Sequence, residues 1–173
     1  MPDKTKAVFF DRDGTLNVNT GYLHDPADFS WIEGAIDAIK RCTAAGFLVI
    51  VVTNQSGVAR GYYEESAVRE LHDWMNGELS RHHAHIDRFY YCPHHPEAKI
   101  AAYRKDCDCR KPRTGMIDAA CADFNIERGA SFLVGDKQVD MQAAKAAGIT
   151  GVLYEGGSLL ELVEKSIFAK ILP

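Results

Sequence analysis

The chain has 173 residues, of which 46% are hydrophobic and 25% are charged, with a formal net charge of −4. This length predicts one domain, 1–173, with a sizeable core, and the net charge gives no indication of a basic surface for nucleic acid. No apolar run reaches membrane-spanning length and none resembles a signal peptide, so we expect a cytoplasmic protein. We expect it to be a monomer with neither nucleic-acid nor membrane partners. In the cytoplasm its five cysteines should stay reduced.

Apolar runs typical of buried strands recur along the chain, at 7–10, 47–53, 88–92, 132–135 and 151–154. Segments with helical spacing follow them, around 32–39, 68–79, 116–124, 141–147 and 159–163. Gly46 and Gly148 are expected helix ends, and Thr114 is a possible N-cap. Strands that alternate with helices predict an α/β fold: a Rossmann-like parallel sheet with helices on both faces. Such sheets bind ligands at the carboxyl ends of their strands.

The first strand runs directly into Asp11-Arg12-Asp13-Gly14-Thr15. A period of two would send the carboxylates of Asp11 and Asp13 toward the same face, which costs energy unless a cation shares them. A hard divalent cation such as Mg²⁺ would do so, and Gly14 lets the chain turn away without crowding. The alternative is a solvated turn, because Asp and Gly are common in turns.

After the second strand come Thr53, Asn54, Gln55, Ser56 and Gly57. Their hydroxyl, amide and backbone N–H groups could hold a phosphate. A simple polar turn is the alternative.

Cys92 and His94 follow the third strand, and Cys107 and Cys109 close the same loop, 92–109. Three thiolates and an imidazole form a closed tetrahedral set for Zn²⁺, so the predicted role of the metal is structural. Four unrelated reduced residues are the alternative, and His95 could replace His94 as ligand. Cys42 and Cys121 lie in helical patterns and are interpreted as buried apolar residues.

Arg110 and Lys111 follow the zinc loop and suit a phosphate-bearing ligand, although a solvated basic tip would look the same. Asp136 follows the fourth strand and would face the same crevice as Asp11, as a third oxygen ligand for Mg²⁺. Asp140 is interpreted as a favourable charge near a helix start rather than as a supporting residue of the site. The remaining histidines on or after the long helix are interpreted as solvated: His72, His82, His83 and His85.

Together these motifs resemble the pattern of the haloacid dehalogenase superfamily. The features that carry the resemblance are Asp-x-Asp-Gly-Thr, the Thr-Asn turn, a lysine before the third helix and Gly-Asp after the fourth strand. Within it, five stretches are similar to the family of D-glycero-D-manno-heptose 1,7-bisphosphate 7-phosphatases: 10–15, 53–57, 92–96, 107–112 and 134–137. The similarity runs from about Ala7 to Tyr154. It implies a haloacid dehalogenase-like phosphatase domain with a minimal cap and a zinc-stabilised loop.

The resemblance also implies roles for individual residues. Asp11 would be the nucleophile and Asp13 the general acid and base, while Thr53 and Lys111 would hold the transferring phosphoryl group. Mg²⁺ would be held by Asp11, the backbone carbonyl of Asp13, and Asp136. Contacts with substrate would come from Asn19, Thr20, Gly21, Tyr22, Asn54, Gln55, Ser56, Arg110 and Lys137.

We therefore expect a Mg²⁺-dependent phosphoric monoester hydrolase with a structural Zn²⁺, acting on a sugar bisphosphate in ADP- or GDP-heptose synthesis for lipopolysaccharide core or surface glycan. The alternative is a histidinol-phosphate phosphatase, or a phosphatase of another small phosphomonoester. The related histidinol-phosphate enzymes share the zinc signature with a shorter loop between the ligand pairs. A regulatory domain without catalysis is a third possibility, but it would be expected to lack Asp11.

Overall fold

The computed structural model describes residues 3–171 and is built on a five-stranded parallel sheet in the order β3-β2-β1-β4-β5. The strands are β1 (Ala7–Phe10), β2 (Leu48–Asn54), β3 (Arg88–Cys92), β4 (Phe132–Gly135) and β5 (Thr150–Leu153). The helices are α1 (Ala35–Ala44), α2 (Glu65–Arg81), α3 (Gly115–Phe124), α4 (Gln138–Ala147), α5 (Leu159–Val163) and α6 (Ala169–Ile171). The predicted parallel α/β architecture is confirmed.

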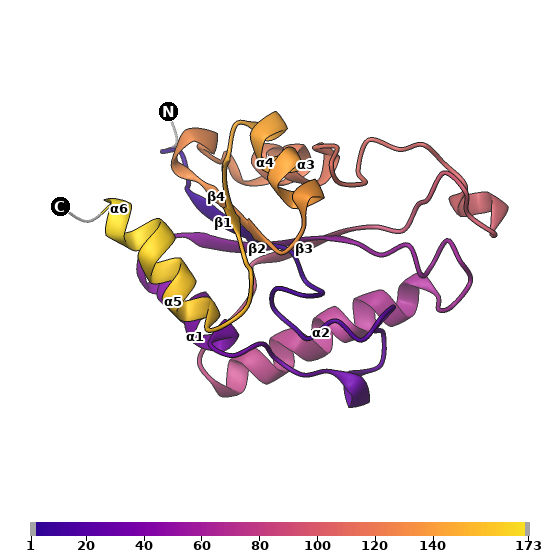
Figure 1. Ribbon diagram of the computed structural model, residues 1–173, viewed down its shortest axis with the longest axis horizontal. Coiled ribbons are helices and arrows are strands. Elements are labelled where there is room, and N and C mark those ends of the chain that lie inside the picture. Colours follow the sequence, from indigo (N-terminus) through magenta and orange to yellow (C-terminus); the bar gives the residue numbers. More distant parts are fainter. Residues whose placement is uncertain (1–2, 172–173) are drawn as a thin grey trace.

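The two faces of the sheet belong to two separate apolar cores. Val8 and Phe10 of β1 point into the core that holds buried residues of α1, α2 and α5. Ala7 and Phe9 point the other way, into the core that holds residues of α3 and α4. Figure 1 shows the same division, with α1, α2 and α5 on one side of the sheet and α3 and α4 on the other. Because both faces are covered, the strands are apolar along their length, as the sequence indicates.

Element boundaries differ from the sequence expectation where a backbone feature decides them. Helix α1 begins at Ala35 and not near Ile32, because Gly34 has a left-handed conformation with φ 75°. Thr114 does precede α3, but its hydroxyl donates to the Asp118 carboxylate and accepts no capping hydrogen bond from a helix backbone N–H. After α5 the chain continues through a π-helical stretch, Glu164–Phe168, before α6.

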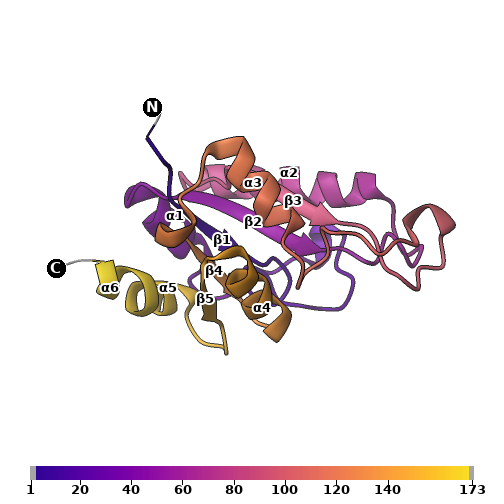
Figure 2. The ribbon, with the colours of Figure 1, turned by 90° about the horizontal axis from the view of Figure 1, so that it is seen from above.

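Long connections gather at the carboxyl ends of the strands. Figures 1 and 2 both show the loop after β3 projecting beyond that end of the sheet. The segment after β1 is irregular apart from a 3₁₀ helix at Pro26–Asp28, as expected of a loop beside the site. Helices with the length and apolar character needed to cross a membrane are absent from residues 3–171.

Candidate active site

A cavity of about 470 Å³ opens at the carboxyl ends of β1 and β2. Most of the sequence-predicted site residues line it: Asp11, Asp13, Asn19, Gly21, Tyr22, Thr53, Asn54, Gln55, Ser56, Arg110, Lys111 and Lys137. Thr20 is exposed and is not among the lining residues. Four further residues line the cavity that the sequence did not single out for it: Arg60, Tyr63, Val139 and Asp140.

Lys111 is buried at the floor of this cavity between two carboxylates. Its Nζ lies 2.8 Å from Oδ1 of Asp11 and 2.7 Å from Oδ1 of Asp140, and it also donates to the Val52 carbonyl. Burial alone would lower the pKa of Lys111, but the charges of Asp11 and Asp140 outweigh it and raise that pKa. The ammonium group therefore stays charged beside Asp11.

Asp140 has a larger part in the site than its sequence position suggested. Its side chain is 1% exposed, forms the ion pair with Lys111, and accepts a hydrogen bond from the Lys137 backbone N–H at the start of α4. The interpretation as a helix-start charge was therefore incomplete. One carboxylate caps the helix with Oδ2 and fixes Lys111 with Oδ1, because the Lys111 side chain reaches the first turn of α4.

The carboxylates of Asp11, Asp136 and Asp140 form a crowded acidic group, with oxygens within 4.8 Å of one another. Burial, and then hydrogen bonding and repulsion from Asp11, raise the pKa of Asp136 to about 6. Oδ1 of Asp136 is buried and has no hydrogen-bond partner among residues 3–171. An unpartnered carboxylate oxygen beside a second carboxylate fits a hard cation with oxygen ligands, so these residues suit Mg²⁺.

Gly14 keeps this acidic group accessible. It has φ 89°, and a Cβ atom at this position would collide with the Asp136 carboxylate. A side chain at position 14 is therefore excluded by both backbone conformation and space.

Asp13 points into the same cavity and is held by donors on both carboxylate oxygens. Arg12 donates from Nε and Nη2, Asn17 donates from Nδ2 at 3.0 Å, and Gln55 donates from Nε2 at 3.1 Å. The side chain remains 20% exposed, on the cavity side. Asp13 is thus fixed in orientation while staying within reach of a ligand.

His72 is buried, which corrects its interpretation as a solvated residue. Its imidazole stacks on Phe89 and lies 3.2 Å from Nη1 of Arg12. Burial, and then the charge of Arg12, lower the pKa of His72 well below its usual value, so the ring is neutral and accepts a hydrogen bond from Arg12. This contact helps to place Arg12, which is fully buried, against Asp13.

The turn after β2 is joined to the segment that carries Lys111. Asn54 donates from Nδ2 to the Lys111 carbonyl and accepts from the Lys111 backbone N–H. Thr53 accepts a hydrogen bond from Gln55, which places its hydroxyl at the cavity floor. Asn54 therefore fixes the approach of Lys111, and Thr53 faces the cavity.

The four predicted zinc ligands lie together in the loop after β3. The three sulfur atoms are 2.9–3.4 Å apart, and Nδ1 of His94 lies 3.4 Å from the Cys109 sulfur and 3.8 Å from that of Cys92. The sulfur separations lie between the about 2.05 Å of a disulfide and the about 3.7 Å expected for thiolates on one zinc. The hydrogen bond between Cys109 and Cys92 lowers the pKa of Cys109 to about 5, and the thiolate is the form that binds metal. The cluster could hold zinc.

The structure distinguishes the two adjacent histidines. His94 joins the sulfur cluster, whereas Nδ1 of His95 accepts a hydrogen bond from the Glu97 backbone. Burial, and then the charges of Arg110 and Arg60, lower the pKa of His95. Of the other cysteines, Cys42 is buried as expected, and Cys121 is only partly buried against the α3–α4 core.

Replacing Cys107 by serine is expected to remove the metal and loosen the loop, because a hydroxyl is a poor zinc ligand and three ligands remain. Elemental analysis should find about one zinc per wild-type chain and a much lower content in the variant. Cys121→Ser, outside the cluster, is the matched control and should keep its zinc. Full zinc occupancy in Cys107→Ser would contradict the ligand set.

Comparisons with known proteins agree with this arrangement. A family model described as HAD-hydrolase-like matches residues 108–167. The D-glycero-beta-D-manno-heptose-1,7-bisphosphate 7-phosphatase of Pasteurella multocida (strain Pm70) is 49% identical over 144 residues, which are 83% of this chain and 78% of that protein. The same-named protein of Escherichia coli (strain K12) is 46% identical over 158 residues, 91% of this chain and 83% of the relative.

A solved structure is also similar. The D,D-heptose 1,7-bisphosphate phosphatase from B. bronchiseptica, complexed with magnesium and phosphate, superimposes with a TM-score of 0.79 at 30% identity. The match covers 98% of this chain and 89% of that one.

Proposed function

Because the chain belongs to the family of D-glycero-beta-D-manno-heptose-1,7-bisphosphate 7-phosphatases, we propose that it hydrolyses the 7-phosphate of that sugar through an ester of Asp11. The observation that carries the proposal is the contact of Asp11 with Lys111 at the floor of the cavity, beside Asp136 and within the cavity that Asp13 also faces. All the proposed catalytic groups belong to one sheet and its loops, so we take the chain as one catalytic domain, 1–173.

The first half of the reaction forms the covalent intermediate. A carboxylate oxygen of Asp11 attacks phosphorus as the bond from phosphorus to O7 breaks, and Asp13 gives a proton to the departing O7. Lys111 and the Thr53 hydroxyl offset the negative charge on the phosphoryl oxygens. When bound at Asp11, Asp136 and the Asp13 carbonyl, Mg²⁺ supplies further charge neutralisation at those oxygens.

The second half releases phosphate. A water attacks phosphorus and gives a proton to Asp13, and the bond to Asp11 breaks to restore the free carboxylate. Asp13 therefore acts first as an acid and then as a base, which requires a fixed orientation. The donors from Arg12, Asn17 and Gln55 provide that orientation.

The substrate-binding side of the cavity is rich in cations, with Arg110, Lys111 and Lys137 lining it. This charge suits a substrate with two phosphates. It opposes histidinol phosphate, which has one phosphate and carries amine and imidazole groups that a cation repels when they are protonated.

Phosphate release by the Mg²⁺-loaded enzyme, measured over the heptose 1,7-bisphosphate, histidinol phosphate and p-nitrophenyl phosphate, tests the proposal. We expect kcat/KM for the bisphosphate to exceed that for histidinol phosphate by at least about tenfold, the value of one charge-assisted contact. Faster turnover of histidinol phosphate would overturn the assignment.

A further inference from the structure

Two guanidinium groups face the cavity without a full set of partners. Arg60 comes from the loop between β2 and α2, and Arg110 from the end of the zinc loop, and both line the cavity. Nε of Arg60 and Nη1 of Arg110 are each buried and lack a hydrogen-bond partner among the described residues 3–171. Leaving a buried charged donor unsatisfied is costly, so both groups are placed for a ligand that accepts hydrogen bonds.

Arg60 is held in a defined place by its neighbours. Its guanidinium lies 5.7 Å from the ring centroid of Tyr22, which in turn packs edge-on against Tyr62. Its backbone N–H donates to the Ser56 carbonyl at 3.0 Å, which closes the turn that follows β2. Arg60 is thus anchored at the cavity wall, where its guanidinium lacks a full set of partners among the described residues.

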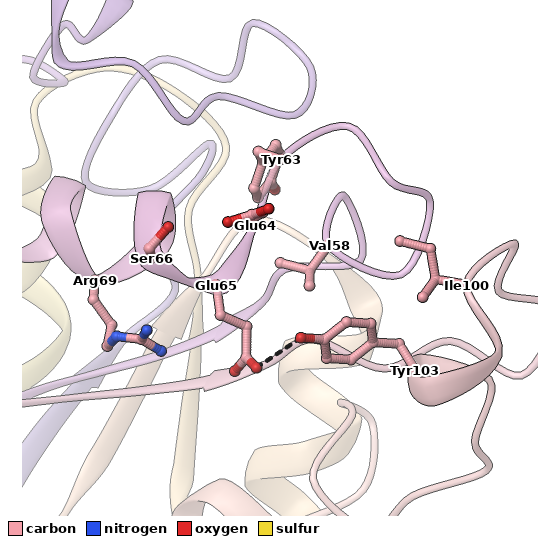
Figure 3. A pocket seen from close by; sticks show the side chains of 8 residues that line it. All are labelled: Val58, Tyr63, Glu64, Glu65, Ser66, Arg69, Ile100 and Tyr103. Carbon is pink, nitrogen blue, oxygen red and sulfur yellow. Dashed lines mark hydrogen bonds between the residues drawn. The ribbon is translucent and has the colours of Figure 1, made fainter.

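The two segments that carry these arginines are tied to each other. Next to Arg60, the Ala59 carbonyl accepts a hydrogen bond from the Ile100 backbone N–H of the zinc loop. Figure 3 shows the adjoining contact, in which Tyr103 of the same loop donates to Glu65 at the start of α2. Tyr91 of β3 donates to the second Glu65 oxygen. The zinc loop and the Arg60 turn therefore form one fixed wall of the cavity.

The phosphate that is cleaved already has its own partners, Lys111 and Thr53, at the floor beside Asp11. The arginines line the same cavity from other segments, Arg60 from the turn after β2 and Arg110 from the residue that follows the zinc loop. We infer that Arg60 is a specificity-determining residue that, together with Arg110, binds the phosphate that is not cleaved. This inference rests on the proposed function and adds to it a residue and a subsite chemistry: a sugar phosphate dianion held by two guanidinium groups.

The matched substrates for a test are the heptose 1,7-bisphosphate and the heptose 7-phosphate, which carry the same scissile ester and differ only in the distal phosphate. In Arg60→Gln and Arg60→Ala, kcat/KM for the bisphosphate should fall about tenfold to a hundredfold, the effect of one lost charged hydrogen bond. The decrease in kcat/KM for the 7-phosphate should be smaller than the decrease for the bisphosphate by a factor of about ten or more. Arg60→Gln keeps a long stem against Tyr22, so it reports on charge if the alanine variant folds poorly.

Arg81→Ala, at the exposed end of α2, removes an equal charge far from the cavity and should leave kcat/KM for both substrates unchanged. The ratio of kcat/KM for the bisphosphate to kcat/KM for the 7-phosphate is measured first in the wild-type enzyme. If the proposed function is wrong, the wild type will show no preference for the bisphosphate. The inference itself is overturned if the wild type prefers the bisphosphate and the Arg60 variants keep that preference, whether kcat/KM stays unchanged or decreases equally for both substrates.

Discussion

Replacing Asp11 by asparagine is expected to reduce turnover by about 10⁴-fold or more, because an amide cannot attack phosphorus and no other carboxylate in the site can take its place. Asp136 would be occupied as a ligand of Mg²⁺, and Asp140 is bound to Lys111. The measurements are kcat for phosphate release and mass spectrometry of acid-quenched enzyme, which should show a phosphoryl adduct on the wild type only.

The fold of the Asp11 variant is expected to survive. Lys111 keeps its contacts with Asp140 and the Val52 carbonyl, and the amide oxygen of asparagine can accept the third. Asp73→Asn, on the exposed face of α2, is the matched control and should keep full activity. Substantial phosphatase activity in purified Asp11→Asn would remove Asp11 from the role of nucleophile.

Replacing Asp13 by asparagine should lower kcat for the sugar phosphate by about 10²- to 10⁴-fold, because the departing O7 then leaves without a proton and the water attacks without a base. The expected defect depends on the leaving group. With p-nitrophenyl phosphate, which needs no proton to leave, the first half of the reaction should persist while the second half stays slow.

The diagnostic for Asp13 is therefore a burst of p-nitrophenol, with phosphorylated Asp11 accumulating in the variant. Arg12, Asn17 and Gln55 all donate to the Asp13 carboxylate, so the substitution also removes a negative charge from a hydrogen-bonded position. Asp106→Asn removes the same charge from an exposed residue of the zinc loop and serves as the control for a generic loss of charge. Equal defects on both substrates with no accumulated ester would show that Asp13 supports the site without transferring protons.

The architecture and the location of the site were predictable because each depends on a local pattern. The strands β1, β3 and β4 begin and end where their apolar runs do, and polar residues follow directly at the carboxyl ends. The grouping of three cysteines and one histidine that could hold zinc was also predictable, because their types and spacing fit one metal. The choice between His94 and His95 was not, since it depends on which way the loop turns.

Other features depend on contacts between distant segments. His72 lies on a helix with polar neighbours, and only the packing of α2 on β3 places it against Phe89 and Arg12. Asp140 looked like a helix-start residue because its partner, Lys111, is 29 positions away. Arg60 follows the recognised turn by a few residues, and its place on the cavity wall depends on the turn that its backbone N–H closes with the Ser56 carbonyl.

The central claim is that this chain removes the 7-phosphate and leaves the other phosphate bound to the sugar. The most direct test is ³¹P NMR of heptose 1,7-bisphosphate during turnover by the Mg²⁺-loaded enzyme. The account predicts that the signal of the primary 7-phosphate ester disappears as inorganic phosphate grows, while the anomeric phosphate signal persists at constant area. Loss of the anomeric phosphate first, or an unchanged bisphosphate spectrum with active, metal-loaded enzyme, would contradict it.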